Sequence, residues 1–244
     1  MAQVAYPQKT RRRRTGLPLL PLALLLALAL LGGSFVAYAL WPTWSAAPVA
    51  LDAPALPITI EGVLFEVPPG AIRAAVERHA GAHERIDLAF LWPSLLPPPP
   101  DDGSPIQTPA TAATKQAAER LFVTIAPLGS VLPPNERLRS IYPRYVEATA
   151  SAGADGLAIL PFRIGSPYQG EDLVYLAETP DRFFARCTRQ VGIVPGNCIV
   201  DRQVDRVVVT LRFPRDWLKG WREVSAGIDR LLAQLEQGSG NSNQ

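Results

Sequence analysis

The sequence has little of the residues on which enzyme and metal chemistry depend. Its 244 residues include only two cysteines and two histidines. No G-x-S-x-G motif is present, which is the usual setting of a serine-hydrolase nucleophile. The stretch "AGADG" lacks the G-x-G-x-x-G pattern of a dinucleotide-binding loop. These absences argue against serine-hydrolase and nucleotide chemistry, and the sequence predicts no cofactor.

Charge is absent from Leu17 to Leu40. About 20 apolar residues in a helix cross a hydrocarbon core of ~30 Å, so we predict a single transmembrane helix over residues 16–41. A secretory signal peptide has a shorter apolar centre of about 7 to 15 residues. Ala37-Tyr38-Ala39 nevertheless resembles the A-x-A-like site at which a signal peptide is cleaved. Cleavage near Ala39, which would leave a soluble periplasmic protein, is therefore kept as the alternative.

Basic residues lie on one side of this apolar run. They are Lys9, Arg11, Arg12, Arg13 and Arg14, and the first charge after the run is Asp52. Because positively charged loops stay in the cytoplasm, we expect residues 1–15 to be a cytoplasmic basic tail and the C-terminal domain to be periplasmic. Aromatic rings favour the membrane–water interface, where we place Tyr38, Trp41 and Trp44.

Lysine is scarce and acidic residues prevail beyond the tail. Lysine occurs only at positions 9, 115 and 219, and the abundance of arginine, alanine and proline is typical of a high-GC bacterial genome. Five of the 24 basic residues are in the tail, so the other 19 face 22 acidic residues and give a net charge of −3. Nucleic-acid binding needs a concentrated basic face, so we predict no nucleic-acid partner.

The two cysteines, Cys187 and Cys198, both follow the predicted span, in a compartment where disulfides persist. The stretch "RFFARCTRQVGIVPGNCIVDRQV" indicates two β-strands joined by a turn at Pro195-Gly196-Asn197. Such a hairpin would place the sulfurs opposite one another. Since the spacing is not C-x-x-C and no histidine lies nearby, we predict a structural disulfide rather than a redox pair or a metal site.

Composition divides the remaining chain into segments. We predict a Pro/Ala-rich linker at 42–57, one periplasmic domain at 58–237 with a Pro-rich loop at 97–114, and a disordered tail at 238–244. In "ITIEGVLFEV" the apolar alternation changes phase at Gly62, which indicates a bulge or tight turn. The next stretch predicts a short helix with Ile72, Ala75, Val76 and His79 on one face.

The last part of the domain has the clearest periodicity. One face of the strand candidate 207–213 carries Val207, Val209, Leu211 and Phe213, and the other face should be wet. A helix follows with apolar residues at steps of four, three, four, three and four: Trp217, Trp221, Val224, Ile228, Leu231 and Leu235. With six or seven strands, the sequence predicts an α+β domain with a mainly antiparallel sheet and a C-terminal amphipathic helix.

Few residues are candidates for chemistry. His79 and His83 are four apart, which would place two imidazoles on one helix face beside Glu84, as in a metal site. The order is not H-E-x-x-H, and Gly81 weakens a helix, so polar capping of a short helix is the favoured interpretation and no metal is predicted. We expect Glu171-Asp172 and Asp101-Asp102 in solvated loops. Tyr168 and Gln169 are recognition candidates at a loop tip, although a plain hairpin loop is favoured.

The resulting hypothesis is a single-pass inner-membrane protein with a disulfide-containing periplasmic domain. It would be a non-catalytic accessory or interaction module of an envelope complex, in contact with the lipid bilayer and with an envelope protein partner through a sheet edge or the closing helix. One alternative is an envelope hydrolase, metal-dependent through His79 and His83. Another is a cell-wall or lipid-binding module, which exposed Trp and Tyr side chains would indicate.

Overall fold

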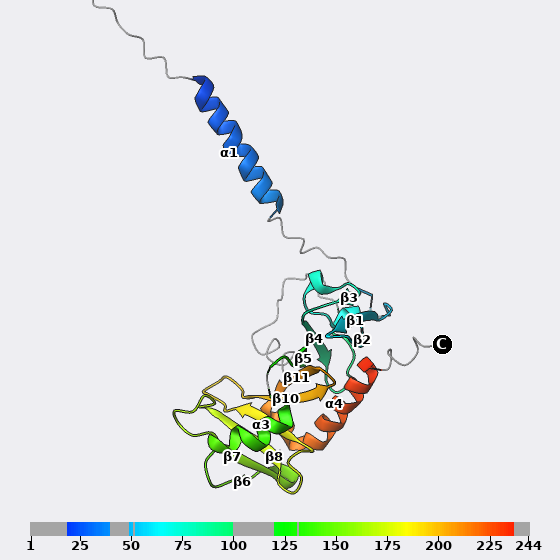
Figure 1. Ribbon diagram of the computed structural model, residues 1–244, viewed down its shortest axis with the longest axis vertical. Helices are drawn as coiled ribbons and strands as arrows, with labels where there is room; N and C mark the ends of the chain where they lie inside the picture. The colour runs from blue at the N-terminus through cyan, green and yellow to red at the C-terminus, as the bar shows by residue number, and fades with distance from the viewer. Residues whose placement is uncertain (1–18, 40–48, 51, 100–119, 131, 237–244) are drawn as a thin grey trace, which may run out of the picture. The chain divides into compact units, whose positions relative to one another are not determined.

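The chain forms two compact units, residues 1–46 and 47–244. The computed structural model describes residues 19–39, 49–50, 52–99, 120–130 and 132–236 (Figure 1). Several predictions concern positions outside the described residues: the basic tail with Arg11 to Arg14, the side chains of Tyr38, Trp41 and Trp44, Asp101-Asp102, most of the loop 97–114, and the tail 238–244.

The first unit contains helix α1, Leu19–Ala39, which is 21 residues long. Its described large apolar side chains are all exposed, from 52 % for Val36 to 71 % for Phe35. By length and hydropathy together, none of the helices in the described part of the chain qualifies as a membrane span.

The second unit is built on two sheets. The smaller has the order β2-β1-β3, with an antiparallel β1–β2 pair and a parallel β1–β3 pair. The larger has eight strands in the order β4-β5-β11-β10-β9-β8-β7-β6, all antiparallel. The strands are β1 Leu56–Ile60, β2 Val63–Val67, β3 Gly81–Ala82, β4 Ile86–Leu91, β5 Arg120–Pro127, β6 Ser151–Ala152, β7 Leu157–Pro161, β8 Glu171–Leu176, β9 Phe184–Thr188, β10 Asn197–Val204 and β11 Val207–Pro214.

This architecture confirms the α+β class, the mainly antiparallel sheet and the C-terminal helix. The first strand begins at Leu56, so it takes up the last two positions of the predicted linker 42–57. The phase change at Gly62 is a tight turn: Ile60 pairs with Val63, and both Glu61 (φ 48°) and Gly62 (φ 80°) have the positive φ that a type I′ hairpin turn requires.

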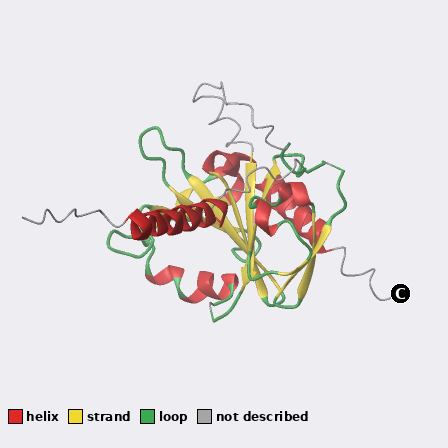
Figure 2. Ribbon diagram, turned by 90° about the horizontal axis from the view of Figure 1, so that it is seen from above, coloured by secondary structure: helices red, strands yellow, loops and turns green. Residues whose placement is uncertain are grey.

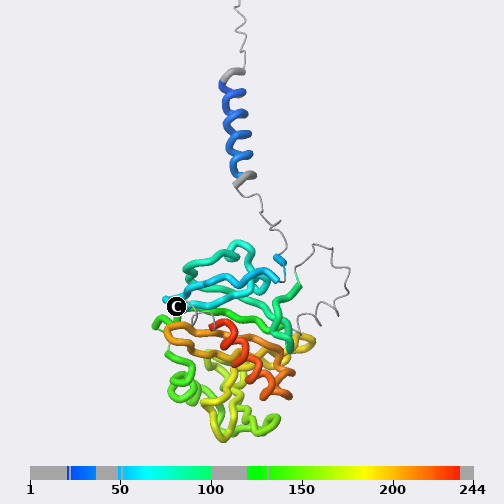
Figure 3. The backbone as a smooth tube through the Cα atoms, turned by 90° about the vertical axis from the view of Figure 1, so that its right-hand side faces the viewer, coloured from blue at the N-terminus to red at the C-terminus, as the bar shows by residue number. Residues whose placement is uncertain are grey.

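The closing helix covers the main core. A 3₁₀ segment, η5 (Arg215–Gly220), leads into α4 (Trp221–Glu236), and the stripe Val224, Ile228, Leu231 and Leu235 is buried as predicted. Trp217 lies in η5 before the α-helix and stacks on Phe213. Figure 3 shows the C-terminal segments, in orange and red, lying between the cyan N-terminal strands and the yellow middle strands. The helix contacts β2, so an early strand and the last helix of this unit pack in the same core.

Gly227 has a packing role in this helix. A Cβ atom there would lie 2.5 Å from the Trp92 ring, so only glycine lets the indole lie across the helix. Glycine in a helix interior costs about 1 kcal/mol relative to alanine. The Trp92 contact is the compensation.

A second apolar cluster lies on the opposite face of the large sheet. Helix α3 (Pro134–Ser140) and the 3₁₀ turn η3 (Tyr142–Arg144) bring Leu138 and Tyr142 against Leu173 and Phe184. The neighbouring residue Val174 belongs to the main core, so β8 is buried on both faces. Figure 2 shows helical segments outside the yellow strands of this unit. On β11 the second face carries half-buried Val208 and Thr210 and exposed Arg212, in line with the expected wet face.

The predicted helix through Ile72 and His79 is wrong. The chain instead forms two 3₁₀ turns, η1 (Pro69–Ala71) and η2 (Ala75–Glu77), with Ile72 buried and Val76 82 % exposed. Ile72 is extended and bridges Leu88, and the Arg73 N–H donates to the Asp87 carbonyl at 3.0 Å. Backbone pairing with β4 therefore replaces the intrahelical bonds, which overrides the local periodicity.

Candidate functional site

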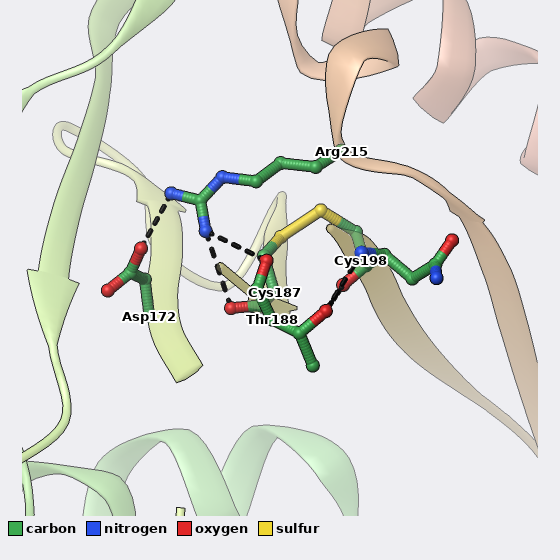
Figure 4. The surroundings of a disulfide bond; sticks show 6 residues. Asp172, Cys187, Thr188, Cys198 and Arg215 are labelled. Carbon is green, nitrogen blue, oxygen red and sulfur yellow. Dashed lines mark hydrogen bonds and ion pairs between the residues drawn. A yellow bond between two sulfur atoms is a disulfide. The ribbon is translucent and has the colours of Figure 1, made fainter. Parts of the chain in front are cut away.

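The strongest candidate site lies at one end of the large sheet, on the loop 189–196 between β9 and β10. Cys187 and Cys198 face each other across these strands and form a disulfide with an S–S distance of 2.04 Å, which confirms the predicted bond. The backbone N–H of Asn197 donates to Thr188 Oγ1 at 2.9 Å (Figure 4). The turn expected at Pro195-Gly196-Asn197 is not the reversal point, because Asn197 already begins β10. The base of the loop is thus closed by a covalent bond and a side-chain hydrogen bond.

A buried carboxylate reinforces this base. Asp172, with a side-chain exposure of 6 %, accepts hydrogen bonds from Arg189 Nε at 2.8 Å and Arg215 Nη2 at 2.6 Å. Arg215 Nη1 also donates to the carbonyl oxygens of Cys187 at 3.4 Å and Thr188 at 3.2 Å, so its guanidinium bridges Asp172 and the disulfide-bonded strand (Figure 4). One arginine from the β11–α4 connection therefore ties together two neighbouring strands.

The expectation that Glu171-Asp172 would be a solvated loop pair is wrong. Both residues open strand β8, Asp172 is buried, and Glu171 pairs with Arg186 at 2.9 Å. No local pattern indicates this arrangement, because the two arginines that hold Asp172 follow it by 17 and 43 residues.

The loop displays three exposed apolar side chains, which we name the apolar tip: Val191 (74 % exposed), Ile193 (99 %) and Val194 (63 %). Val191 and Val194 exchange backbone hydrogen bonds of 3.2 and 3.0 Å around Gly192-Ile193. Gly192 has φ +59°. Glycine at the first central position is the preference of a type II′ hairpin turn. The backbone thus forms a small hairpin that holds apolar side chains in solvent.

The neighbouring loop 162–170, between β7 and β8, lies beside this one, since Arg189 N–H donates to the Gly170 carbonyl at 3.1 Å. It adds an exposed apolar side chain, Ile164, which is 90 % exposed. Two adjacent loops at the same end of the sheet therefore present apolar side chains to solvent.

Tyr168 and Gln169, the recognition candidates on that loop, have an internal role. Tyr168 packs edge-on against Tyr142 at 5.4 Å between ring centroids, and the Arg186 guanidinium lies 5.0 Å from its ring. Burial raises the pKa of the Tyr142 phenol. Gln169 Oε1 accepts a hydrogen bond of 2.8 Å from the Gly165 N–H. These residues hold the loop in shape.

A cleft of about 490 Å³ adjoins the loop. Arg189, Arg215 and Lys219 contribute three cationic groups to its lining, and the buried Asp172 and the exposed Asp216 contribute two carboxylates. Ile159 and Leu218 provide apolar surface. Gln190, which also lines the cleft, directly precedes the apolar tip, so the two features are continuous.

The histidine pair does meet, although not on a helix. The rings of His79 and His83 stack with centroids 4.4 Å apart, and His83 Nε2 lies 3.0 Å from the His79 carbonyl oxygen. Gly81, at φ +114°, takes the chain out of a helical path and into β3. Both the shared helix face and the helix-capping role are therefore wrong. Glu84 is exposed, and the described part of the chain holds no group of three or more side chains suited to a metal.

Aromatic side chains do not form an exposed surface on the folded unit. Among its described residues every Trp, Tyr and Phe is at least half-buried, and Trp92 and Trp217 are stacked on each other with centroids 5.0 Å apart. The sign expected of a cell-wall or lipid binder is therefore missing from the described aromatic residues.

No protein family and no curated protein matches this sequence. Among solved structures, the chain is similar to an immunity protein of the Stenotrophomonas maltophilia type IV secretion system, with a TM-score of 0.49 and 12 % identity over 78 % of this chain and 99 % of that one. It is also similar to an iron-regulated outer membrane lipoprotein of Neisseria meningitidis, with a TM-score of 0.35 and 8 % identity over 68 % of this chain and 83 % of that one. Likenesses this distant carry no information on function.

Proposed function

We propose that this protein is an accessory module of a cell-envelope complex and that it binds a protein partner through the apolar tip. The observation that carries the proposal is the exposure of Val191, Ile193 and Val194 on a loop whose base is closed by the Cys187–Cys198 disulfide. The proposed role is binding, without catalysis.

Exposure of this kind is costly unless a partner removes it from water. A single exposed apolar side chain is ordinary, but a contiguous apolar group on a loop marks an interaction site. Burying a Val or Ile side chain contributes about 1.5–3 kcal/mol. A loop already held in one shape also loses less conformational entropy on binding. The disulfide and the Asp172 ion pairs give the loop such a shape.

In this proposal, residues 16–41 anchor the chain in the inner membrane, with the N-terminus in the cytoplasm and the folded unit in the periplasm. Three observations support it: the basic residues before the apolar run, the disulfide, and the exposed apolar side chains of α1, for which lipid would be a better environment than water. A soluble periplasmic form produced by cleavage near Ala39 is the alternative.

Site-specific photocrosslinking in living cells tests the partner proposal. A photoreactive residue replaces Ile193 in the full-length chain and, as the matched control, Asp205, which is exposed in the turn at the other end of β10. We expect a discrete protein adduct from position 193 and none from position 205. Equal adducts at both positions, or none at position 193, would contradict the proposal.

The intact mass of the membrane-extracted protein, measured without reductant after thiol alkylation, tests the location. A full-length mass without alkylation supports a retained anchor and an oxidised pair. A mass beginning at Leu40 would favour the cleaved form. Alkylation of both cysteines would overturn the exported topology.

A further inference from the structure

The loop end differs in charge from the rest of the folded unit. We define the loop end as residues 161–172, 186–197 and 214–220, which the strand pairing brings to one end of the sheet. It contains five basic residues, Arg163, Arg186, Arg189, Arg215 and Lys219, and three acidic ones, Glu171, Asp172 and Asp216, for a net charge of +2. The 19 basic and 22 acidic residues after position 46 leave 14 and 19 elsewhere, a net charge of −5.

The acidic groups of the loop end cancel only part of its positive charge. Asp172 is buried between Arg189 and Arg215, and Glu171 is taken up by Arg186. Asp216 is the exposed one, and it lies 4.0 Å from Lys219 with both side chains at least 85 % exposed. A solvent-exposed pair at that distance interacts weakly. Two positive charges therefore stay in excess at the loop end, beside the apolar tip.

The cationic groups gather where they can act together with the tip. Arg189, Arg215 and Lys219 line the cleft that begins at Gln190, next to Val191. Asp172 fixes the first two guanidiniums, so they need little ordering on binding. Lys219 is 85 % exposed and is held only by its 4.0 Å contact with Asp216, so its ammonium can turn towards a ligand. A fixed pair of guanidiniums and a mobile ammonium beside an apolar surface match a side chain that ends in a carboxylate.

We infer that the partner segment is acidic: it places an apolar side chain against the apolar tip and a carboxylate in the cleft of Arg189, Arg215 and Lys219. This inference rests on the proposed function and adds the chemistry of the partner. The positive loop end on an otherwise negative unit would also orient the partner during encounter.

Charge reversal at Lys219 tests the inference in the full-length chain with the photoreactive residue at position 193. Lys219→Glu introduces repulsion at an exposed position, and Lys219→Gln removes the charge alone. The control is Arg230→Glu, the same charge change on an exposed residue of α4 that lines a different hollow. We expect adduct yield to fall about fivefold in Lys219→Glu, less in Lys219→Gln, and to stay unchanged in Arg230→Glu. In isolated membranes, raising salt from about 0.05 to about 0.5 M should lower the yield of the parent chain as well.

The outcomes separate this inference from the proposed function. A parent adduct that is insensitive to Lys219→Glu and to salt would overturn the acidic partner while leaving the partner site standing. Equal losses in Lys219→Glu and Arg230→Glu would also overturn it, since a general charge effect would then explain the result. If the parent chain forms no protein adduct, or crosslinks to lipid instead, the proposed function itself fails.

Discussion

The two ends of strand β10 join it to its neighbours in opposite ways. At the Val204 end, β10 returns to β11 through the two-residue turn Asp205-Arg206, whose side chains are exposed and charged. At the Asn197 end, it is connected to β9 through the loop 189–196, which is tipped by exposed Val and Ile side chains and closed by a disulfide. The first hairpin makes its connection with the fewest residues and exposes only charged side chains to solvent. The second orders more residues than the connection needs.

That difference supports the proposed role of the loop 189–196 in binding a partner. A longer loop costs more entropy to close and to order. The chain offsets this cost with a disulfide, a buried carboxylate and two arginines, all at the base of one loop. Such support for a loop that exposes apolar residues is expected when the shape of the tip matters. The turn at Asp205 needs no such support.

Removing the disulfide should break the comparison most strongly. The double variant Cys187→Ala, Cys198→Ala loses a cross-link with a sequence separation of 11, for which chain entropy gives a loss of about 3 kcal/mol in the free energy of unfolding. Urea denaturation of the variant and of the parent, with and without reductant, measures it. A loss below about 1 kcal/mol would mean that the loop base is held by its non-covalent contacts.

Removing the buried carboxylate should have the next largest effect. Asp172→Ala leaves Arg189 and Arg215 without their shared partner, and we expect the free energy of unfolding to fall by about 2 kcal/mol. This value is below that of a fully buried pair because the arginine side chains are 46 % and 25 % exposed. Asp216→Ala, at a side chain that is 86 % exposed, is the control and should change stability by less than about 0.5 kcal/mol. Similar losses in the two variants would remove the special role of Asp172.

The smallest effects should come from the turns themselves, with opposite signs. Gly192 has φ +59°, so Gly192→Ala should destabilise by about 1 kcal/mol, although a Cβ atom there would meet open space. Asp205 has φ +48°, so Asp205→Gly should stabilise by about 0.5 kcal/mol through relief of strain. Thermal unfolding of the two variants measures both. If both variants shift in the same direction, the backbone conformations assigned to these turns are wrong.

The sequence was a good guide wherever local periodicity and burial agreed. The stripe Val224, Ile228, Leu231 and Leu235 predicted the closing helix because one face of α4 is buried along its length. The disulfide could be predicted from the cysteine pair because β9 and β10 follow one another in the chain and pair directly. Both patterns can be seen within a short stretch of sequence, although the surface that buries the α4 stripe includes the distant strand β2.

Features that depend on distant residues could not be predicted. Asp172 was predicted to be half of a solvated pair, because no residue close to it in sequence indicates that Arg215 is its partner. Nothing close in sequence explains a glycine at position 227 of a helix, because the residue that requires it is Trp92, far earlier in the chain. His79 and His83 had helical spacing, but the backbone between them pairs with β1, and the His83 N–H donates to the Thr59 carbonyl at 2.9 Å. In each case a tertiary contact decided the outcome.

The contact between α4 and β2 means that the core of the folded unit cannot be completed until the end of the chain is present. Phe65 and Val67 of β2 belong to the buried core that α4 completes, yet α4 is the last described element of the chain. The N-terminal strands leave a ribosome or an export channel first. Their apolar faces therefore stay exposed until residues 221–236 have been added. During that interval the unfinished core is open to aggregation. A chain cut short before α4 should therefore be a substrate for chaperones and proteases rather than a smaller folded protein.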